Sequence, residues 1–263
     1  MADLDALLRD FSDECTELER IVAALAPADW SQPTPAPGWS IAHQIGHLAW
    51  TDEVATMAAA DADGFAKLLE DAAPKVLTFV DAAAEEAAST PAAELLDRWR
   101  RGRDDLIDAL RAVPSGTKLP WFGPPMSPAS MVSARIMETF AHGQDVADAL
   151  GVTRTPTARL RTVAHIGVRT RNFAYTVHGK NAPAEEFRVE LTASDGDIWS
   201  WGPEDATQRV TGPALDFCLL VTQRRHRDDL ALETEGADAA EWLTIAQAFA
   251  GPTGTGRAAG QFD

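Results

Sequence analysis

Three side chains suited to hold a metal ion lie in two segments of the sequence. Glu138 and His142 are four residues apart, and His47 stands in an earlier segment. A helix turns about 100° per residue, so residues at i and i+4 share a face and one rigid helix presents both ligands. Two imidazoles and one carboxylate form the ligand set of catalytic zinc sites that keep a fourth position open. The alternative is a solvated, salt-bridged stripe, because Arg135 and Asp145 share that face.

The segment that carries Glu138 and His142 has clear helix boundaries. Ser127 offers an N-cap oxygen, and Pro128 fits the first turn, where no backbone N–H is needed. Gly151 can take the left-handed conformation that ends a helix. The sequence therefore predicts a helix over residues 127–150.

The segment around His47 also reads as a helix. Ser40 follows a turn and is a candidate N-cap, and His47 lies off an apolar stripe formed by Ile41, Ile45 and Leu48. Such a histidine is either a metal ligand or a hydrogen-bonded core residue. His43 and His47 form a rival ligand pair, which we rank lower because a side chain three residues after the cap faces back to the helix start.

Composition excludes several classes of partner. The chain has 263 residues, 45% of them hydrophobic, and a formal charge of −17 without a basic cluster, which argues against nucleic acid and anionic membranes. The first residues lack a basic and apolar leader, and no run reaches the length of a membrane span. Cys15 and Cys218 are far apart in helical segments, so a disulfide is not expected. We expect a cytoplasmic protein with small-molecule partners.

The pattern changes along the chain from helical to mixed. Apolar residues at steps of three and four predict helices over 4–25, 65–88, 91–113 and 160–178. Alternation at 187–191 and 198–201 around a turn at 194–197 predicts a hairpin. Further strands at 207–211 and 230–234 and helices at 214–224 and 239–249 complete the prediction. This order indicates a helical bundle followed by a small α+β domain.

A loop with four prolines separates two of the expected helices. Residues 114–126 contain Trp121, Phe122 and Met126 among these prolines. Two readings stay open: the rings form a lid on the bundle core, or Trp121 and Phe122 form a wall of a ligand pocket beside the Glu138 helix.

Short motifs in this order resemble a known family. The strings PGWS at 37–40, GHLA at 46–49 and ETFAHGQDV at 138–146 are similar to those of the mycothiol-dependent maleylpyruvate isomerase family, a branch of the DinB-like metal-binding bundles. The resemblance implies an α+β fold with a DinB-like four-helix-type bundle over residues 1–155. A connecting helix and linker over 156–184 and a sterol-carrier-like α+β domain over 185–256 would follow.

The resemblance also implies roles for particular residues. In the family, positions matching His47, Glu138 and His142 bind a divalent metal, usually zinc, although such ligands also accept nickel, cobalt, iron or copper. A coordinated thiol loses its proton, so mycothiol would arrive as a metal-bound thiolate. An arginine of the C-terminal domain reaches the family's site, and Arg224 and Arg225 are the candidates here. Their alternative role is to complement a helix dipole.

Acidic neighbours can orient the ligand histidines. Asp145 lies one turn beyond His142, and Asp52 and Glu53 follow His47. The alternative, which the acidic composition favours, is that they are ordinary exposed helix charges.

Three functional hypotheses follow from the sequence and the resemblance. The first is a metal-dependent transferase or isomerase that uses mycothiol on a small electrophile. The second is a carrier, in which the C-terminal domain and the Trp121–Phe122 loop enclose an apolar molecule and the metal is structural or absent. The third is a metal-dependent hydrolase, which needs a general base that the sequence does not single out.

Overall fold

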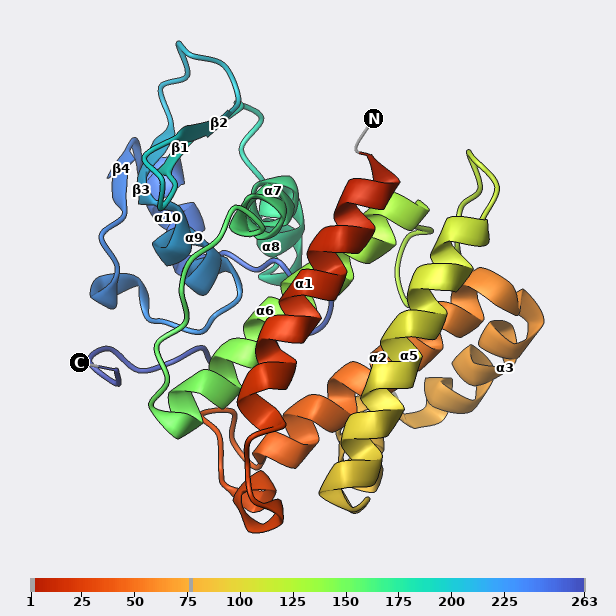
Figure 1. The fold of residues 1–263 in the computed structure, drawn as a ribbon. Coiled ribbons are helices and arrows are strands. Elements are labelled where there is room, and N and C mark those ends of the chain that lie inside the picture. Colours follow the sequence, from red (N-terminus) through yellow and green to blue (C-terminus); the bar gives the residue numbers. More distant parts are fainter. Residues whose placement is uncertain (1–2, 76–77, 263) are drawn as a thin grey trace. The chain divides into compact units, whose positions relative to one another are not determined.

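The chain forms two compact units. A computed structural model describes residues 3–75 and 78–262, and its contacts divide the chain into Met1–Arg154 and Thr155–Asp263. Figure 1 shows the first unit as helices and the second as a small sheet with helices. The predicted α+β fold, with a helical N-terminal part, is confirmed.

The first unit is a bundle in which α2 is the central helix. It packs against α4, α5 and α6, while α1 packs against α6 and α5 (Figure 1). The helices are α1 Leu4–Val22, α2 Ile41–Ala60, α3 Ala62–Ala72, α4 Phe79–Ala88, α5 Ala92–Ala112 and α6 Pro128–Leu150, with 3₁₀ turns at Pro27–Ser31 and Ala73–Lys75.

Both predicted ends of α6 and the predicted start of α2 are confirmed. The Ser127 side chain accepts a hydrogen bond from the Ser130 backbone N–H at 3.1 Å, and Gly151 ends α6 with a φ of 64°. Ser40 caps α2 in a capping box with His43. These ends depend on residues within one turn, which explains why they can be read from sequence.

The single helix expected over residues 65–88 is wrong. The structure has α3, a 3₁₀ turn and α4 there, and residues 76–77 lie outside the described part of the chain. Pro74 lies in the turn, where its missing N–H and its ring are incompatible with a continuous helix. The apolar periodicity alone concealed this break.

The second unit contains a four-stranded sheet in the order β2-β1-β3-β4. β1 pairs antiparallel with β2, as the predicted hairpin requires, and parallel with β3, while β3 and β4 are antiparallel. Helix α9 packs on β1 and β3, and α7 packs on α9. The elements are α7 Leu160–Arg169, α8 Arg171–Val177, β1 Arg188–Thr192, β2 Ile198–Trp201, β3 Arg209–Pro213, α9 Ala214–Val221, a 3₁₀ turn Arg227–Asp229, β4 Glu233–Glu235 and α10 Ala237–Ile245.

The helix expected over residues 160–178 is two helices. The break falls at Thr170, whose hydroxyl donates to the Ile166 and Gly167 carbonyls at 3.0 and 3.1 Å. A threonine bonded back to the preceding turn competes with the helical ladder and bends or ends the helix. Both helices belong to the second unit, within the segment predicted to connect the two domains.

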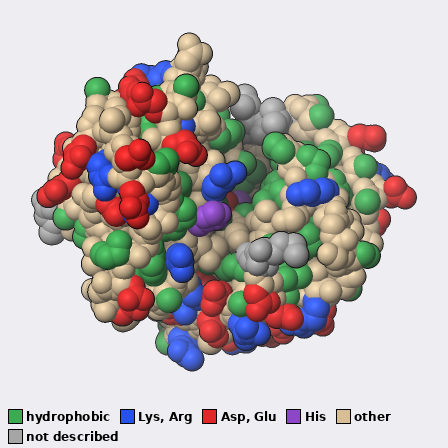
Figure 2. Space-filling view, turned by 90° about the horizontal axis from the view of Figure 1, so that it is seen from above, with side chains coloured by type: hydrophobic (Ala, Val, Ile, Leu, Met, Phe, Trp, Pro, Cys, Tyr) green, Lys and Arg blue, Asp and Glu red, His purple; other side chains and the backbone are tan. Residues whose placement is uncertain are grey.

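Charged side chains are scattered over the face in view in Figure 2 without a segregated positive surface. Figure 2 shows aspartate and glutamate side chains interspersed with lysine and arginine over that face, in keeping with the formal charge of −17. Among the described residues, no helix combines the length and the apolar character that a membrane crossing needs.

A close approach of α4 to α2 leads to a prediction about stability. A Cβ added at Gly46 would lie 2.6 Å from the Ala87 Cβ, whereas one added at Gly102, also buried in a helix, would meet nothing closer than 3.8 Å. We therefore expect Gly46→Ala to destabilise the protein by about 1–3 kcal/mol, since it overpacks a rigid contact. Gly102→Ala should stabilise it by about 0.5–1 kcal/mol through helix propensity. Urea unfolding of both variants measures this, and equal effects would contradict the close packing of α4.

Candidate metal centre

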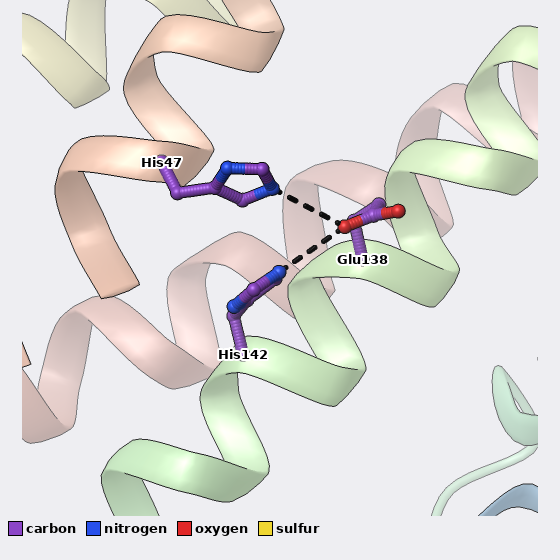
Figure 3. Close-up of side chains that lie close together, drawn as sticks. All are labelled: His47, Glu138 and His142. Atoms are coloured by element: carbon purple, nitrogen blue, oxygen red, sulfur yellow. Dashed lines mark hydrogen bonds and ion pairs between the residues drawn. The ribbon is translucent and has the colours of Figure 1, made fainter. Parts of the chain in front are cut away.

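The structure brings His47, Glu138 and His142 together on facing surfaces of α2 and α6. Figure 3 shows His47 reaching from α2 toward Glu138, with His142 one turn along α6. Glu138 Oε2 lies 3.5 Å from His47 Nε2 and 3.2 Å from His142 Nε2. One carboxylate oxygen therefore faces both imidazoles.

The spacing of these atoms fits a small tetrahedral ion. Tetrahedral bonds of about 2.0–2.1 Å, as in zinc sites, place ligand atoms about 3.3–3.4 Å apart. The two measured separations lie on either side of that value, and the candidate ligand atoms of all three residues lie within 4.8 Å of one another. An adjustment of a few tenths of an ångström would accommodate the ion.

Glu138 supplies a negative charge to the site. Burial raises the pKa of this carboxyl, but hydrogen bonds and charge from His142 and His47 outweigh the burial and hold the pKa well below its usual value. Glu138 is therefore ionised at neutral pH, as a ligand to a divalent cation must be.

A buried glutamine orients one of the histidines. His142 Nδ1 is 2.5 Å from Gln44 Oε1, and Gln44 Nε2 donates to Thr34 Oγ1 at 2.8 Å. Because the amide oxygen accepts from Nδ1–H, the proton that His142 gives up to a metal is the one that Nε2 shares with Glu138, and Nε2 becomes the ligand atom. Sequence reasoning missed Gln44. The signal was a polar residue in an apolar helix that proves to be fully buried.

Two of the acidic residues considered for this orienting role, Asp52 and Glu53, are paired with arginines. Asp52 accepts from Arg135, and Glu53 accepts from Arg98. His47 Nδ1 has no hydrogen-bond partner among the described residues. Asp145 is buried rather than an exposed helix charge.

The rival pair of His43 and His47 is not assembled. His43 Nδ1 lies 3.2 Å from the Ser40 backbone nitrogen, and its Nε2 lies 2.8 Å from Glu85 on α4. The expectation that His43 faces back to the helix start is confirmed. Both ring nitrogens are occupied in holding the start of α2.

The Trp39 ring lies against both histidines of the site. Its ring stacks on His142 with centroids 5.8 Å apart and lies 5.4 Å from the His47 ring. Its indole N–H donates to Asp81 on α4 at 3.1 Å. The tryptophan thus borders and restrains both imidazoles.

The other predicted residues belong to different elements of the two units. Trp121 and Phe122 are in the first unit, where Trp121 stacks on Phe65 and Phe122 lies beside Trp50. Arg224 and Arg225 follow α9 in the second unit, and the Arg225 guanidinium lies 3.8 Å from the Phe262 ring centroid. We call His47, Glu138 and His142 the triad. A role for either arginine at the triad stays a prediction.

A helical bundle with a two-histidine, one-glutamate cluster between facing helices defines the class of the first unit. A family model described as the mycothiol maleylpyruvate isomerase N-terminal domain matches residues 11–147. The chain belongs to this family, which confirms the resemblance read from the sequence. A second model, described as wyosine base formation, matches residues 183–234.

Two curated relatives match nearly the whole chain. Both are uncharacterized proteins of Mycobacterium tuberculosis, one from strain CDC 1551 / Oshkosh and one from strain ATCC 25618 / H37Rv. Each is 58% identical over 257 residues, covering 98% of this chain and 100% of the relative.

Two solved structures share the fold at low identity. They are the mycothiol-dependent maleylpyruvate isomerase, with a TM-score of 0.60 and 15% identity, and a histidine-to-alanine mutant of that enzyme, with 0.59 and 14%. Each match covers 88% of this chain and 93% of the solved chain.

The contact between Gln44 and His142 predicts an effect on metal affinity. Gln44→Ala should weaken zinc binding about 10–100-fold, because the His142 ring loses the partner that fixes its orientation and tautomer. Gln144→Ala is the matched control, since Gln144 is also buried but bonds Asp148 instead. Competition with a chromogenic chelator measures both affinities. Equal affinities in the two variants would remove this role from Gln44.

Two adjacent acidic residues on α2 give a second prediction. Asp52 pairs with Arg135 at 2.8 Å with side chains 0% and 2% exposed, whereas the Glu53–Arg98 pair is 41% and 33% exposed. Asp52→Ala should cost about 3–5 kcal/mol of unfolding free energy, because it leaves a buried guanidinium unpaired. Glu53→Ala should cost about 0–1 kcal/mol, as exposed pairs do. Denaturant unfolding compares them, and similar losses would mean that water reaches the Asp52–Arg135 pair.

Proposed function

We propose that this protein is a metal-dependent transferase or isomerase that joins mycothiol to a small electrophile. The observation that carries the proposal is the convergence of His47, Glu138 and His142 at separations suited to a tetrahedral divalent ion. Family membership supports the choice of thiol, because the matching model is that of the mycothiol maleylpyruvate isomerase N-terminal domain.

The residues present fit such an ion, with zinc as our choice. His47 Nε2, His142 Nε2 and Glu138 Oε2 would hold it and leave a position for the thiol. When bound, the ion would supply positive charge that lowers the pKa of the thiol and yields a strong nucleophile at neutral pH. Gln44 and Trp39 keep the two imidazoles in place, so the ligand atoms would need to move only slightly.

The nucleophilic thiol must come from outside the chain. Cys15 and Cys218 are both buried and free of disulfides. Burial and, next, the charge of Asp52 raise the pKa of the Cys15 thiol well above its usual value, so that it stays protonated and inert. The protein's own cysteines are therefore unsuited to the reaction, and a low-molecular-weight thiol fills this role.

The reaction itself follows from thiol chemistry at a conjugated double bond. The sulfur bonds to the β-carbon, a proton adds to the α-carbon, and the former double bond becomes a single bond. If the adduct is released, the protein is a transferase. If the single bond rotates and the same proton and sulfur leave, the product is a geometric isomer. Arg224 or Arg225 would anchor a carboxylate of the substrate or of mycothiol.

The two alternatives have less support from the site. A hydrolase needs a general base near the metal, but the carboxylates that follow His47, those of Asp52 and Glu53, are engaged by arginines. A carrier with a structural metal needs a closed ligand shell, whereas the triad supplies three ligands. A cytoplasmic location accords with the two free thiols and with a reducing compartment.

Metal analysis of the purified protein tests the proposal. We expect about one zinc or other divalent ion per chain in the wild type. The ion should be lost in His47→Ala and in His142→Ala, because two protein ligands hold it much more weakly than three. Thiol-adduct formation with mycothiol should be lost in the same two variants.

His43→Ala is the matched control for this experiment. His43 is a helical histidine on α2 whose ring bonds Ser40 and Glu85 instead of the triad, so the variant should keep its metal despite a loss of stability. If the wild type takes up no divalent ion after reloading, or if His142→Ala forms thiol adducts at the wild-type rate, the proposed function is wrong.

A further inference from the structure

Aromatic rings continue from the triad along one side of the bundle. Trp50 lies one turn after His47 on α2, and the centroids of the two rings are 6.1 Å apart. The Trp50 ring meets Phe79 edge to face at 5.3 Å and lies 6.4 Å from Phe122, while Phe79 and Phe122 are 6.5 Å apart. We call Trp50, Phe79 and Phe122 the aromatic wall.

The aromatic wall differs from the core that it borders. Phe65 is fully buried with Val54 and Ala58, and Trp121 stacks on Phe65 at 5.9 Å. Trp121 therefore covers the core. Phe122, the next residue, remains 44% exposed, and Trp50 and Phe79 are only partly buried. Phe122 also meets Phe65 edge to face at 5.6 Å, and Trp50 packs against the same core residues, so the aromatic wall borders the core and keeps part of its surface exposed.

The loop that carries Phe122 is fixed at its base. The backbone N–H of Leu119 donates to the Met126 carbonyl at 2.7 Å, and the Met126 N–H donates to the Leu119 carbonyl at 2.9 Å. Leu119 is itself buried. These bonds close the loop into a short hairpin, so Phe122 is held in position before any ligand arrives, which lowers the entropic cost of binding.

We infer that the aromatic wall binds a flat aromatic or conjugated apolar body of the electrophile, whose reactive carbon then lies at the triad. Only the placement of the reactive carbon rests on the proposed function, and binding of the aromatic body to the wall does not. Partly exposed rings in mutual contact offer faces and edges to a further ring, and such ring pairs are favourable beyond the area they bury. A small, strongly hydrated substrate would gain nothing from this surface.

The aromatic wall adjoins the triad, which indicates where the aromatic body and the reactive end of the ligand lie. The His47 ring lies 6.1 Å from the Trp50 ring, and its Nε2 faces Glu138, so one imidazole borders both the aromatic wall and the ligand cluster. Trp39 borders both histidines and so limits the space around the two imidazoles. The wall is therefore positioned to hold the body of a molecule whose end reaches the metal ligands.

A matched pair of alcohols tests the wall without any reaction. Cinnamyl alcohol and crotyl alcohol differ only in phenyl against methyl, and neither is an electrophile. Calorimetric titration of the metal-loaded protein should show at least about tenfold tighter binding of cinnamyl alcohol. Phe122→Ala should lose about that factor while keeping its metal, because the loop is closed by backbone bonds.

Phe173→Ala is the control, since Phe173 is a similarly exposed phenylalanine, 38% exposed, on α8. It should bind both alcohols as the wild type does. Equal affinity of the wild type for the two alcohols, or unchanged binding in Phe122→Ala, would overturn the inference.

A second measurement separates this inference from the proposed function. Mycothiol addition to cinnamaldehyde and to crotonaldehyde is followed with each rate divided by the uncatalysed rate, and we expect the wild type to favour cinnamaldehyde and Phe122→Ala to lose that preference. Tight, Phe122-dependent binding of cinnamyl alcohol without any catalysed addition would support the wall and refute the thiol chemistry. Catalysed addition with equal preference for both aldehydes would support the chemistry and refute the wall.

Discussion

The packing of α2 against α6 is the constraint on which the site depends. The three candidate ligands come from these two helices, so their separation is that of the helices themselves. The ion pair between Asp52 and Arg135 lies in this contact, with Arg135 less than one turn before Glu138. A buried guanidinium that loses its carboxylate is strongly destabilising, which penalises any sliding of α2 along α6. The pair thereby fixes the register in which His47 meets Glu138.

A second set of contacts holds the start of α2 from outside. Helix α4 supplies Asp81 to the Trp39 indole and Glu85 to His43, and it can come this close because position 46 is glycine. The segment before α2 supplies Thr34 to Gln44. Asp81, Glu85 and Thr34 therefore hydrogen-bond to residues that surround the two imidazoles. Such an arrangement keeps ligand atoms available while limiting the motion of the rings.

What could be read from the sequence was local. Helix ends marked by Ser40, Ser127 and Gly151 were predicted because the capping groups lie within a turn of the backbone that they satisfy. The shared face of Glu138 and His142 follows from helical geometry. The contact between Gln44 and His142 joins residues 98 positions apart, and no periodicity encodes it. The breaks at Pro74 and Thr170 were missed because the apolar spacing continues through both residues.

The triad and the aromatic wall can specify different parts of one reaction. A metal held by two imidazoles and a carboxylate would activate any thiol that can reach it, so the three ligands carry little information about the electrophile. The wall is assembled from α2, α4 and the loop over 119–126, three elements that contribute one ring each. Substitution of one ring would change the shape offered to a ligand without touching a metal ligand. The low identity to the solved isomerase, 15% at a TM-score of 0.60, accords with a preserved bundle that accepts such changes. Under the proposed function, the chemistry lies in the α2–α6 contact and the choice of electrophile lies in the rings beside it.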